Sequence, residues 1–195
     1  MIFCFLGDSI VNGLRDEECK GWAGRLCSEL CAAGKNVTCY NLGVRREKSL
    51  EVSQRWQAES AARELSFEET RYVFSYGTGD MAVREGKQGA SLEEVEANTR
   101  KILESCQKSK TLFVGPPPVA NPEHTARNSE LSDRLQALCD EYSVPFCNMF
   151  EHIEDLTAYV QNVVASDGIH PSGAGYEMIA QAVASWKPWQ EFVQD

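Results

Sequence analysis

The chain has 195 residues, of which 43% are hydrophobic and 25% are charged, an ordinary balance for one globular domain. This composition excludes a disordered chain, a collagen-like chain and a coiled coil. The formal net charge is −10 and no basic run stands out beyond the pair Arg45-Arg46, so neither nucleic acid nor an anionic membrane surface is expected as a partner.

The eight cysteines are expected to be reduced. The N-terminal apolar run, residues 2–6, is too short for a signal peptide, and no stretch approaches the ~20 apolar residues of a membrane span. We therefore expect a cytoplasmic protein without a membrane span, in which the thiols are small buried hydrophobic groups. The absence of a CxxC pair disfavours zinc and dithiol sites.

Short apolar runs alternate with helical periodicity along the chain. Residues 2–6 and 37–42 are the first two predicted strands, with helical spacing from Ala23 to Cys31 between them. A largely exposed helix over residues 49–65 leads to a third strand, and the capping box of Ser91 and Glu94 begins the next helix. The remaining predicted elements are strands over 71–76, 111–114 and 144–148 and helices around 131–142 and 176–183.

Five short strands alternating with helices predict a single α/β domain over residues 1–195. The expected architecture is doubly wound and flavodoxin-like, with a five-stranded parallel sheet of order 2-1-3-4-5 and helices on both faces. In that order the first strand lies between the second and third, and ligands bind outside the carboxyl ends of the strands. The loops at residues 7–12, 43–48 and 77–89 are therefore expected to form the site.

Two short motifs carry the chemistry. Gly7-Asp8-Ser9 places a serine directly after the first strand, and Asp167 precedes His170 by three residues just before the last helix. Serine hydrolysis needs a hydroxyl, an imidazole that takes its proton and a carboxylate that orients the imidazole. Either motif alone occurs often by chance, but the two together at these positions predict a nucleophile, a base and an orienting acid.

These residues resemble the GDSL/SGNH hydrolase family over the length of the chain. The family has four sequence blocks, which correspond here to Gly7-Asp8-Ser9, to Asn41-Leu42-Gly43, to Gly77-Thr78-Gly79-Asp80, and to Asp167 with His170. The resemblance implies Ser9 as nucleophile, His170 as general base and then acid, and Asp167 as the residue that orients it. It also implies an oxyanion hole formed by the N–H groups of Ser9 and Gly43 and by an asparagine of the third block.

That asparagine is replaced here by Gly79. One oxyanion donor is worth about 3 kcal/mol of transition-state stabilisation. Three interpretations follow: another group supplies the donor, the enzyme is slow with two amides, or the chain is a non-catalytic relative. The candidate replacement donors are the Gly79 N–H, the Thr78 hydroxyl and the Asn12 side chain.

The pocket walls are expected to come from residues 77–90 and the prolines at 116–118, with Met81, Val83 and Arg84 as the side chains of interest there. The substrate-binding positions of this hypothesis are Asp8, Thr78, Asp80 and Met81. Asp8 and Asp80 are interpreted as loop caps that accept backbone N–H groups rather than as metal ligands or catalytic acids. No metal or organic cofactor is expected.

Other chemically capable residues have simpler interpretations. His124 is expected in an exposed loop, and His152 at a solvated helix start. Arg45 and Arg46 are expected to pair with Glu47 or another nearby acid. Trp186 and Trp189 are expected to pack the last helix.

The resemblance implies a serine esterase or lipase that cleaves small or exposed acyl esters through an acyl-serine intermediate. The absence of an insertion large enough for a lid favours short acyl chains. A weakly active or non-catalytic binding module, and an acyl transferase or thioesterase with the same three residues, remain as alternatives. The sequence does not indicate an oligomeric state.

Overall fold

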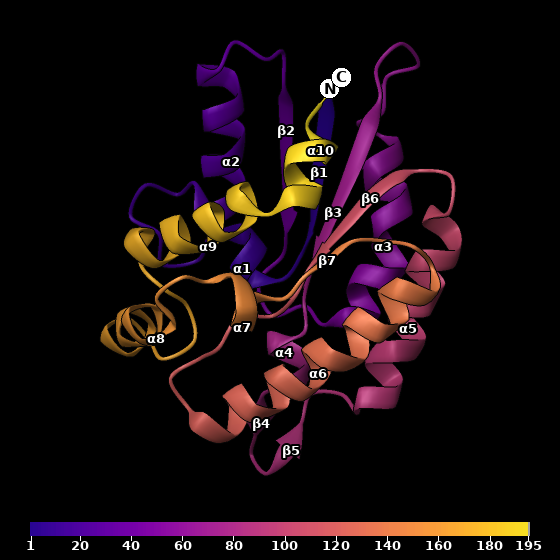
Figure 1. Ribbon diagram of the computed structural model, residues 1–195. Coiled ribbons are helices and arrows are strands. Elements are labelled where there is room, and N and C mark those ends of the chain that lie inside the picture. Colours follow the sequence, from indigo (N-terminus) through magenta and orange to yellow (C-terminus); the bar gives the residue numbers. More distant parts are fainter. Residues whose placement is uncertain (195) are drawn as a thin grey trace.

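A computed structural model describes residues 1–194 and is built around one five-stranded parallel sheet (Figure 1). The strand order is β2-β1-β3-β6-β7, which confirms the predicted order because β4 and β5 lie outside this sheet. The sheet strands are β1 (Ile2–Gly7), β2 (Thr38–Gly43), β3 (Thr70–Ser75), β6 (Lys110–Val114) and β7 (Phe146–Cys147).

Helices cover both faces of the sheet, so its strands are buried on both sides and appear as continuous apolar runs. Helices α2, α9 and α10 lie on one face, while α3, α5 and α6 lie on the other (Figure 1). The helices are α1 (Ser9–Asn12), α2 (Gly21–Ala32), α3 (Ser49–Ala61), α4 (Thr78–Met81), α5 (Leu92–Cys106), α6 (Pro122–Glu141), α7 (Met149–His152), α8 (Leu156–Ala165), α9 (Gly173–Ser185) and α10 (Lys187–Phe192).

The three strands that position the site end at the same level. Gly7 at the end of β1 is in register with Gly43 on β2 and with Ser75 on β3. The backbones approach so closely that a Cβ on Gly7 would lie 1.8 Å from the Ser75 carbonyl oxygen, which leaves room only for glycine. The loops that follow β1, β2 and β3 therefore meet at one edge of the sheet, as predicted.

Several elements differ from the sequence-based expectation. A two-stranded hairpin of β4 (Val83–Arg84) and β5 (Lys87–Gln88) follows α4, and helices α8 and α10 were not predicted. Helix α6 begins at Pro122 rather than near residue 131. Asn121 caps it by accepting the His124 N–H at 2.9 Å, and an N-cap asparagine followed by proline is a helix-start signal that the sequence analysis missed.

The cysteines are all free, but they are not all buried. Cys19 and Cys31 are exposed and Cys39 is half-buried, which corrects the expectation that every thiol lies in the core. Trp189 is buried and its ring contacts those of Phe3 and Phe5, as expected for packing of the C-terminal helices.

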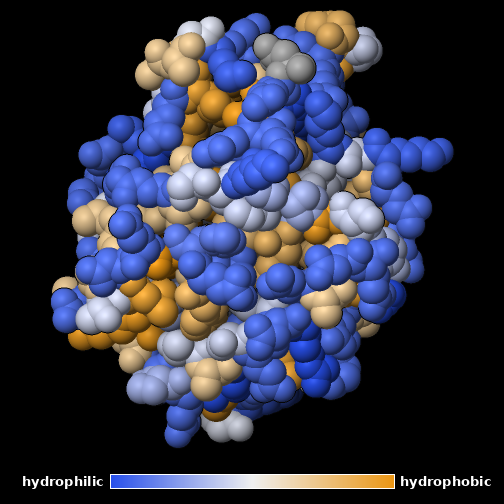
Figure 2. All heavy atoms as spheres, in the orientation of Figure 1, coloured by the Kyte–Doolittle hydropathy of each residue, from blue (hydrophilic) through white to orange (hydrophobic). Residues whose placement is uncertain are grey.

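Hydrophilic residues cover most of the face viewed in Figure 2, with an apolar patch over α8. The exposed large apolar side chains are Val44, Leu50, Leu65, Phe67, Val83 and Val164. Within residues 1–194, no helix combines the length and the apolar character that crossing a bilayer requires.

Candidate active site

Ser9 is the first residue of α1, a four-residue helix that begins directly after β1. Asp8 caps this helix, because its Oδ1 accepts the Ile10 N–H at 2.8 Å. Gly13 ends the helix with a φ of 82°, a conformation that favours glycine. This compact turn holds Ser9 at the carboxyl edge of the sheet.

His170 and Asp167 reach Ser9 from the loop between α8 and α9. His170 Nε2 lies 2.8 Å from Ser9 Oγ, and His170 Nδ1 lies 2.9 Å from Asp167 Oδ2. The Asp167 carboxylate also accepts the backbone N–H groups of Ile169 at 3.1 Å and His170 at 2.8 Å. The geometry fits an Nδ1–H that donates to Asp167 and an Nε2 that is free to accept the Ser9 proton.

Electrostatics keep Asp167 ionised. Burial raises the pKa of its carboxyl, but the hydrogen bonds from His170 and Ile169 outweigh burial and hold the pKa well below its usual range. Arg15 adds a cation, with its Nε 3.3 Å from Asp167 Oδ2. An ionised carboxylate at this position would stabilise a protonated His170 ring.

A pocket of about 590 Å³ opens beside Ser9 and His170. Its walls come from the turn at Asp8 and Ser9, from residues 45–48, from the segment 78–89 that contains the β4–β5 hairpin, and from the start of α6. The expected contribution of residues 77–90 is therefore largely confirmed. The prolines at 116–118 do not line this pocket, contrary to the prediction. The pocket is lined instead by four residues at the start of α6: Asn121, Glu123, His124 and Arg127.

The Gly43 N–H, which the resemblance implies as an oxyanion donor, already has an acceptor. The Gly43 N–H donates to Asn41 Oδ1 at 3.0 Å, and Gly43 does not line the pocket. A Cβ at this position would lie 2.2 Å from the Asn12 backbone nitrogen, so the glycine permits close packing of β2 against α1. The Asn12 side chain does not line the pocket, and its Nδ2 donates one hydrogen bond to the Gly43 carbonyl oxygen at 3.2 Å.

The turn after Gly43 offers a different donor. Glu47 N–H donates to the Val44 carbonyl oxygen at 3.3 Å, and Arg46, the third residue of this turn, has a φ of 72°. This conformation normally selects glycine, and non-glycine residues held in it concentrate at functional sites. Both Arg46 and Ser9 line the pocket, and within residues 1–194 no acceptor is recorded for the backbone N–H of either.

Thr78 and Gly79, at the start of α4, both line the pocket. The Thr78 hydroxyl oxygen is fully covered and has no hydrogen-bond partner among the residues that the structure describes, so a substrate does not reach it. The Gly79 N–H faces the Asp8 carboxylate and lowers its pKa. A Cβ at position 79 would lie 2.9 Å from the Glu47 carbonyl oxygen, so the β2–α3 loop occupies space that a side chain would need.

Asp8 is buried directly behind Ser9. Burial, with a smaller contribution from the nearby Asp80, raises the pKa of its carboxyl to about 7 against the lowering effect of the Ile10, Val11 and Gly79 N–H groups. Asp8 therefore caps a loop, as predicted, and also lines the pocket. Its charge changes near neutral pH.

Replacement of Asp8 by asparagine is expected to remove a pH-dependent loss of stability. The folded protein binds a proton at Asp8 between the ordinary carboxyl pKa of 3.8 and about 7, so its stability falls as pH rises through this window. The free energy of unfolding of Asp8→Asn, relative to that of the wild type, should therefore rise by about 2 kcal/mol from about pH 5.5 to about pH 8. Urea unfolding of both proteins at the two pH values measures this change. A stability difference between variant and wild type that is the same at both pH values would contradict the prediction.

Asp80 and Met81 are fully buried and do not line the pocket, which corrects their prediction as substrate-binding residues. The Asp80 carboxylate accepts the Ser49 hydroxyl at 2.7 Å and the Ser49 N–H at 3.0 Å. Burial raises the pKa of Asp80 to about 6, and the hydrogen bonds from Ser49 oppose that rise. Asp80 therefore joins α4 to the first turn of α3, in agreement with its interpretation as a cap.

His124 is buried rather than exposed, which corrects the sequence-based expectation. Its Nε2 donates to the Thr78 carbonyl oxygen at 2.9 Å, so it holds the loop that precedes Gly79. Burial lowers the pKa of His124 and Arg127 lowers it further, against the hydrogen bond to Thr78, so the ring is neutral at neutral pH. The helix-start signal at Asn121 and Pro122 could have placed this histidine on α6.

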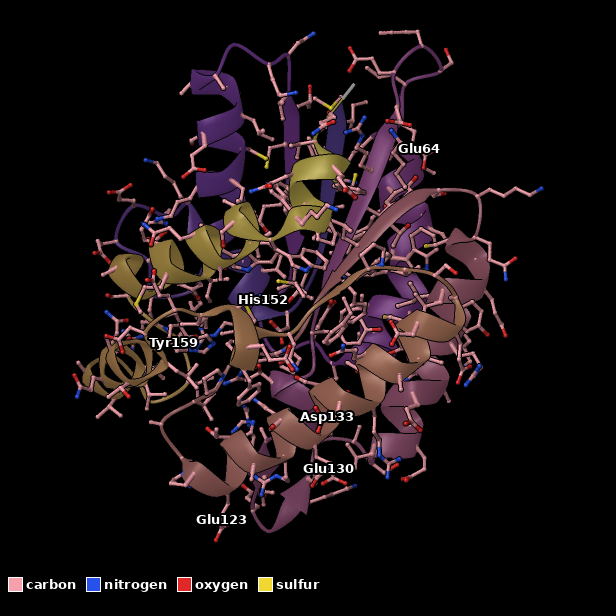
Figure 3. All side chains as sticks on the ribbon, viewed as in Figure 1. Glu64, Glu123, Glu130, Asp133, His152 and Tyr159 are labelled. Atoms are coloured by element: carbon pink, nitrogen blue, oxygen red, sulfur yellow. The ribbon has the colours of Figure 1, made fainter. Side chains whose placement is uncertain are left out.

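Two further predictions concern basic and aromatic residues. Glu47 pairs with Arg55 at 2.6 Å, and within residues 1–194 no ion pair is recorded for Arg45 or Arg46, which corrects their expected local pairing. His152 is half-buried at the end of α7, outside the pocket, and its ring centre lies 6.1 Å from that of Trp186 (Figure 3). Among the described residues, no cluster of three or more His, Cys, Asp or Glu side chains could hold a metal ion.

Solved structures of ester hydrolases resemble this fold. A lipase/acylhydrolase from Enterococcus faecalis has a TM-score of 0.77 and 19% identity, with 93% of this chain and 92% of that chain covered. An acetylxylan esterase from Geobacillus stearothermophilus has a TM-score of 0.73 and 17% identity, with coverage of 100% and 94%. An acetyl xylan esterase, AlAXEase, has a TM-score of 0.76 and 18% identity, with coverage of 95% and 98%. No curated protein sequence matches the chain.

The sequence also matches a family model over most of its length. The model is that of the GDSL-like Lipase/Acylhydrolase family, and the match spans residues 5–178. This range includes the turn at Ser9, the β2–α3 loop, α4 with the hairpin, and the loop that carries Asp167 and His170. The chain therefore belongs to the GDSL-like lipase/acylhydrolase family.

Proposed function

We propose that this protein is a serine esterase that hydrolyses small or exposed acyl esters through an acyl-serine intermediate. The observation that carries the proposal is the 2.8 Å contact between Ser9 Oγ and His170 Nε2, with Asp167 on the opposite ring nitrogen. A module that only binds a ligand has no need of this arrangement. A serine-to-alanine and a histidine-to-alanine variant of the Geobacillus stearothermophilus acetylxylan esterase are both described as catalytic mutants, which supports the same roles for a serine and a histidine here.

The reaction follows from the geometry. Ser9 Oγ attacks the ester carbonyl carbon while its proton passes to His170 Nε2, and the carbonyl π electrons move to the oxygen. When the tetrahedral intermediate collapses, the alcohol leaves with the proton that His170 returns. Water then attacks the acyl-serine in the same way, which releases the acid and restores Ser9.

The oxyanion that forms in each step needs donors aimed at it. The N–H groups of Ser9 and Arg46 are the proposed donors, because both residues line the pocket and neither N–H has a recorded acceptor within residues 1–194. The N–H groups of Gly43 and Gly79 are already directed at Asn41 and at Asp8. The proposed oxyanion hole therefore has two donors, where the resemblance implies three. A modest rate of hydrolysis is expected for this reason.

A fluorophosphonate probe tests the nucleophile directly. We expect covalent labelling of the wild type at Ser9, identified by peptide mass spectrometry, and no labelling of Ser9→Ala. Ser105→Ala, which removes an exposed hydroxyl on α5, is the matched control and should label like the wild type. A wild-type protein that is folded and yet unlabelled between about pH 6 and about pH 9 would overturn the proposal.

Replacement of Gly79 by asparagine, the residue that the resemblance implies at this position, is expected to lower the esterase activity rather than raise it. In Gly79→Asn the new Cβ would lie within 2.9 Å of the Glu47 carbonyl oxygen, so the loop that carries Arg46 must move. A displaced donor should lower kcat/KM for p-nitrophenyl acetate about tenfold. Gly34→Asn is the matched control, since Gly34 has open space around it and asparagine tolerates its φ of 81°. A faster Gly79→Asn enzyme would show that the site lacks a donor which asparagine supplies.

A further inference from the structure

Basic side chains gather around the pocket although the protein is acidic. Six of the 19 Lys and Arg residues line it, but only three of the 29 Asp and Glu residues do. The six cations are Arg45, Arg46, Lys48, Arg84, Lys87 and Arg127. The mouth of the pocket is therefore a local positive region on a molecule with a net charge of −10.

The three acids of the pocket do not neutralise these cations. Glu47 pairs with Arg55 at 2.6 Å, and Asp8 is buried at the base of the pocket, where it accepts the Ile10 N–H. Glu123 extends from the first turn of α6 away from the body of the molecule (Figure 3). Glu130 and Asp133, further along α6, are exposed and do not line the pocket (Figure 3).

Four of the cations have no partner within residues 1–194. Lys48 Nζ donates to the Gly89 carbonyl oxygen at 3.0 Å and Arg127 Nε donates to that of Met81 at 2.9 Å, so these two also brace the pocket wall. No side-chain hydrogen bond or ion pair is recorded for Arg45, Arg46, Arg84 or Lys87 in the described part of the chain. These four are free to bind an anion.

The hairpin presents two of these charges at close range. Arg84 on β4 is paired directly opposite Lys87 on β5 in the antiparallel ladder. Like charges at directly opposite positions destabilise a strand pair. The tight turn at Glu85 and Gly86, with φ angles of 53° and 76°, fixes this pairing. A bound anion would relieve the repulsion between the two cations.

We propose that the substrate of this site is an acyl ester that carries an anionic group, a carboxylate or a phosphate, and that Arg84, Lys87 and Arg45 bind this group at the pocket mouth. The inference rests on the proposed esterase function. Guanidinium groups suit both anions because they donate paired hydrogen bonds to two oxygens. The positive mouth also attracts such a substrate from solution, an effect that salt screens.

A set of aryl acetates tests this proposal. The anionic probes are 4-acetoxybenzoate and 4-acetoxyphenyl phosphate, and the neutral reference is methyl 4-acetoxybenzoate. The quantity measured is the ratio of kcat/KM for each anionic ester to that for the neutral ester, in wild type and in Arg84→Gln/Lys87→Gln. Comparison of this ratio between the two proteins cancels the different chemical reactivity of the esters. The matched control is Lys101→Gln/Lys108→Gln, which removes two charges that do not line the pocket.

We expect the ratio to fall about fivefold in Arg84→Gln/Lys87→Gln for at least one anionic ester and to stay unchanged in the control, a modest change because exposed charge pairs are weak. In the wild type the ratio should also fall as salt increases. Equal ratios in wild type and variant would overturn the proposal, with thermal unfolding used to show that the variant is folded. Absence of Ser9-dependent hydrolysis of all three esters would instead overturn the esterase function itself.

Discussion

Replacement of Ser9 by alanine is expected to lower kcat/KM for short acyl esters by a factor on the order of 10⁴ or more. The variant loses the oxygen that lies 2.8 Å from His170 Nε2, so no acyl-enzyme forms. Hydrolysis of p-nitrophenyl acetate and butyrate, measured with enzyme purified away from host esterases, gives the rate.

The prediction for Ser9 can be checked with a second variant, in which His170 is replaced as well. In the proposed mechanism Ser9 and His170 act as one unit, so the double variant Ser9→Ala/His170→Ala should be no slower than the worse single variant. Thermal unfolding of Ser9→Ala should match the wild type closely, since Ser9 is only half-buried and its hydroxyl contacts His170. A Ser9→Ala protein that keeps more than about a tenth of the wild-type rate would show that this hydroxyl is not the nucleophile.

Replacement of Asp16 by asparagine is expected to cost about 3 kcal/mol of unfolding free energy. Asp16 is buried in the loop between α1 and α2, where it accepts the N–H groups of Lys20 at 3.0 Å and Gly21 at 2.7 Å and pairs with Arg25. Asparagine cannot balance the guanidinium, which is only 10% exposed. Urea unfolding measures the loss, and Asp133→Asn on the exposed face of α6 should change stability by less than about 0.5 kcal/mol.

The stabilisation by Asp16 has a defined pH range. Burial raises the pKa of Asp16, but Arg25 and the N–H groups of Glu18 and Gly21 outweigh burial and hold the pKa at about 2. A lowered pKa means that the stabilisation is complete above the ordinary carboxyl value of 3.8 and is lost as pH falls through about 2. The acid transition of Asp16→Asn should therefore be shallower than that of the wild type. Equal acid transitions would contradict this assignment.

The loop that Asp16 stabilises also contacts the candidate active site. It carries Arg15, whose Nε contacts Asp167, and Leu14, whose carbonyl oxygen accepts the Tyr176 hydroxyl at 2.8 Å. Asp16→Asn is therefore expected to lower the esterase rate as well as the stability. This loop therefore connects fold stability to site geometry, in addition to the strands that position Ser9.

Local patterns in the sequence predicted most of the fold. Buried parallel strands must be apolar throughout, so residues 2–6 and 111–114 were recognisable without knowledge of their neighbours. The hairpin was missed because each of its strands has two residues and little apolar character. The start of α6 was missed although Asn121 and Pro122 form an N-cap signal.

The candidate site also has a part that could be predicted from the sequence and a part that could not. Asp167 and His170 lie three residues apart on one loop, so their hydrogen bonds are local and could be anticipated from spacing. The sequence could not show whether the Gly43 N–H is free, because availability of an N–H depends on what accepts it, and here Asn41 accepts it. No sequence signal indicated that Arg46 adopts a φ of 72°, a conformation usually left to glycine.

The sequence by itself determined the sheet order, the family and the identity of the three triad candidates, because strand hydrophobicity, Gly-Asp-Ser and Asp-x-x-His are properties of contiguous residues. Only the tertiary structure decided which N–H groups remain free, that His124 is buried, and that the unpaired cations gather at one pocket. Those features depend on contacts between residues far apart in the chain, such as Thr78 and His124, which are 46 positions apart. Chain packing sets these contacts, and no local pattern encodes them.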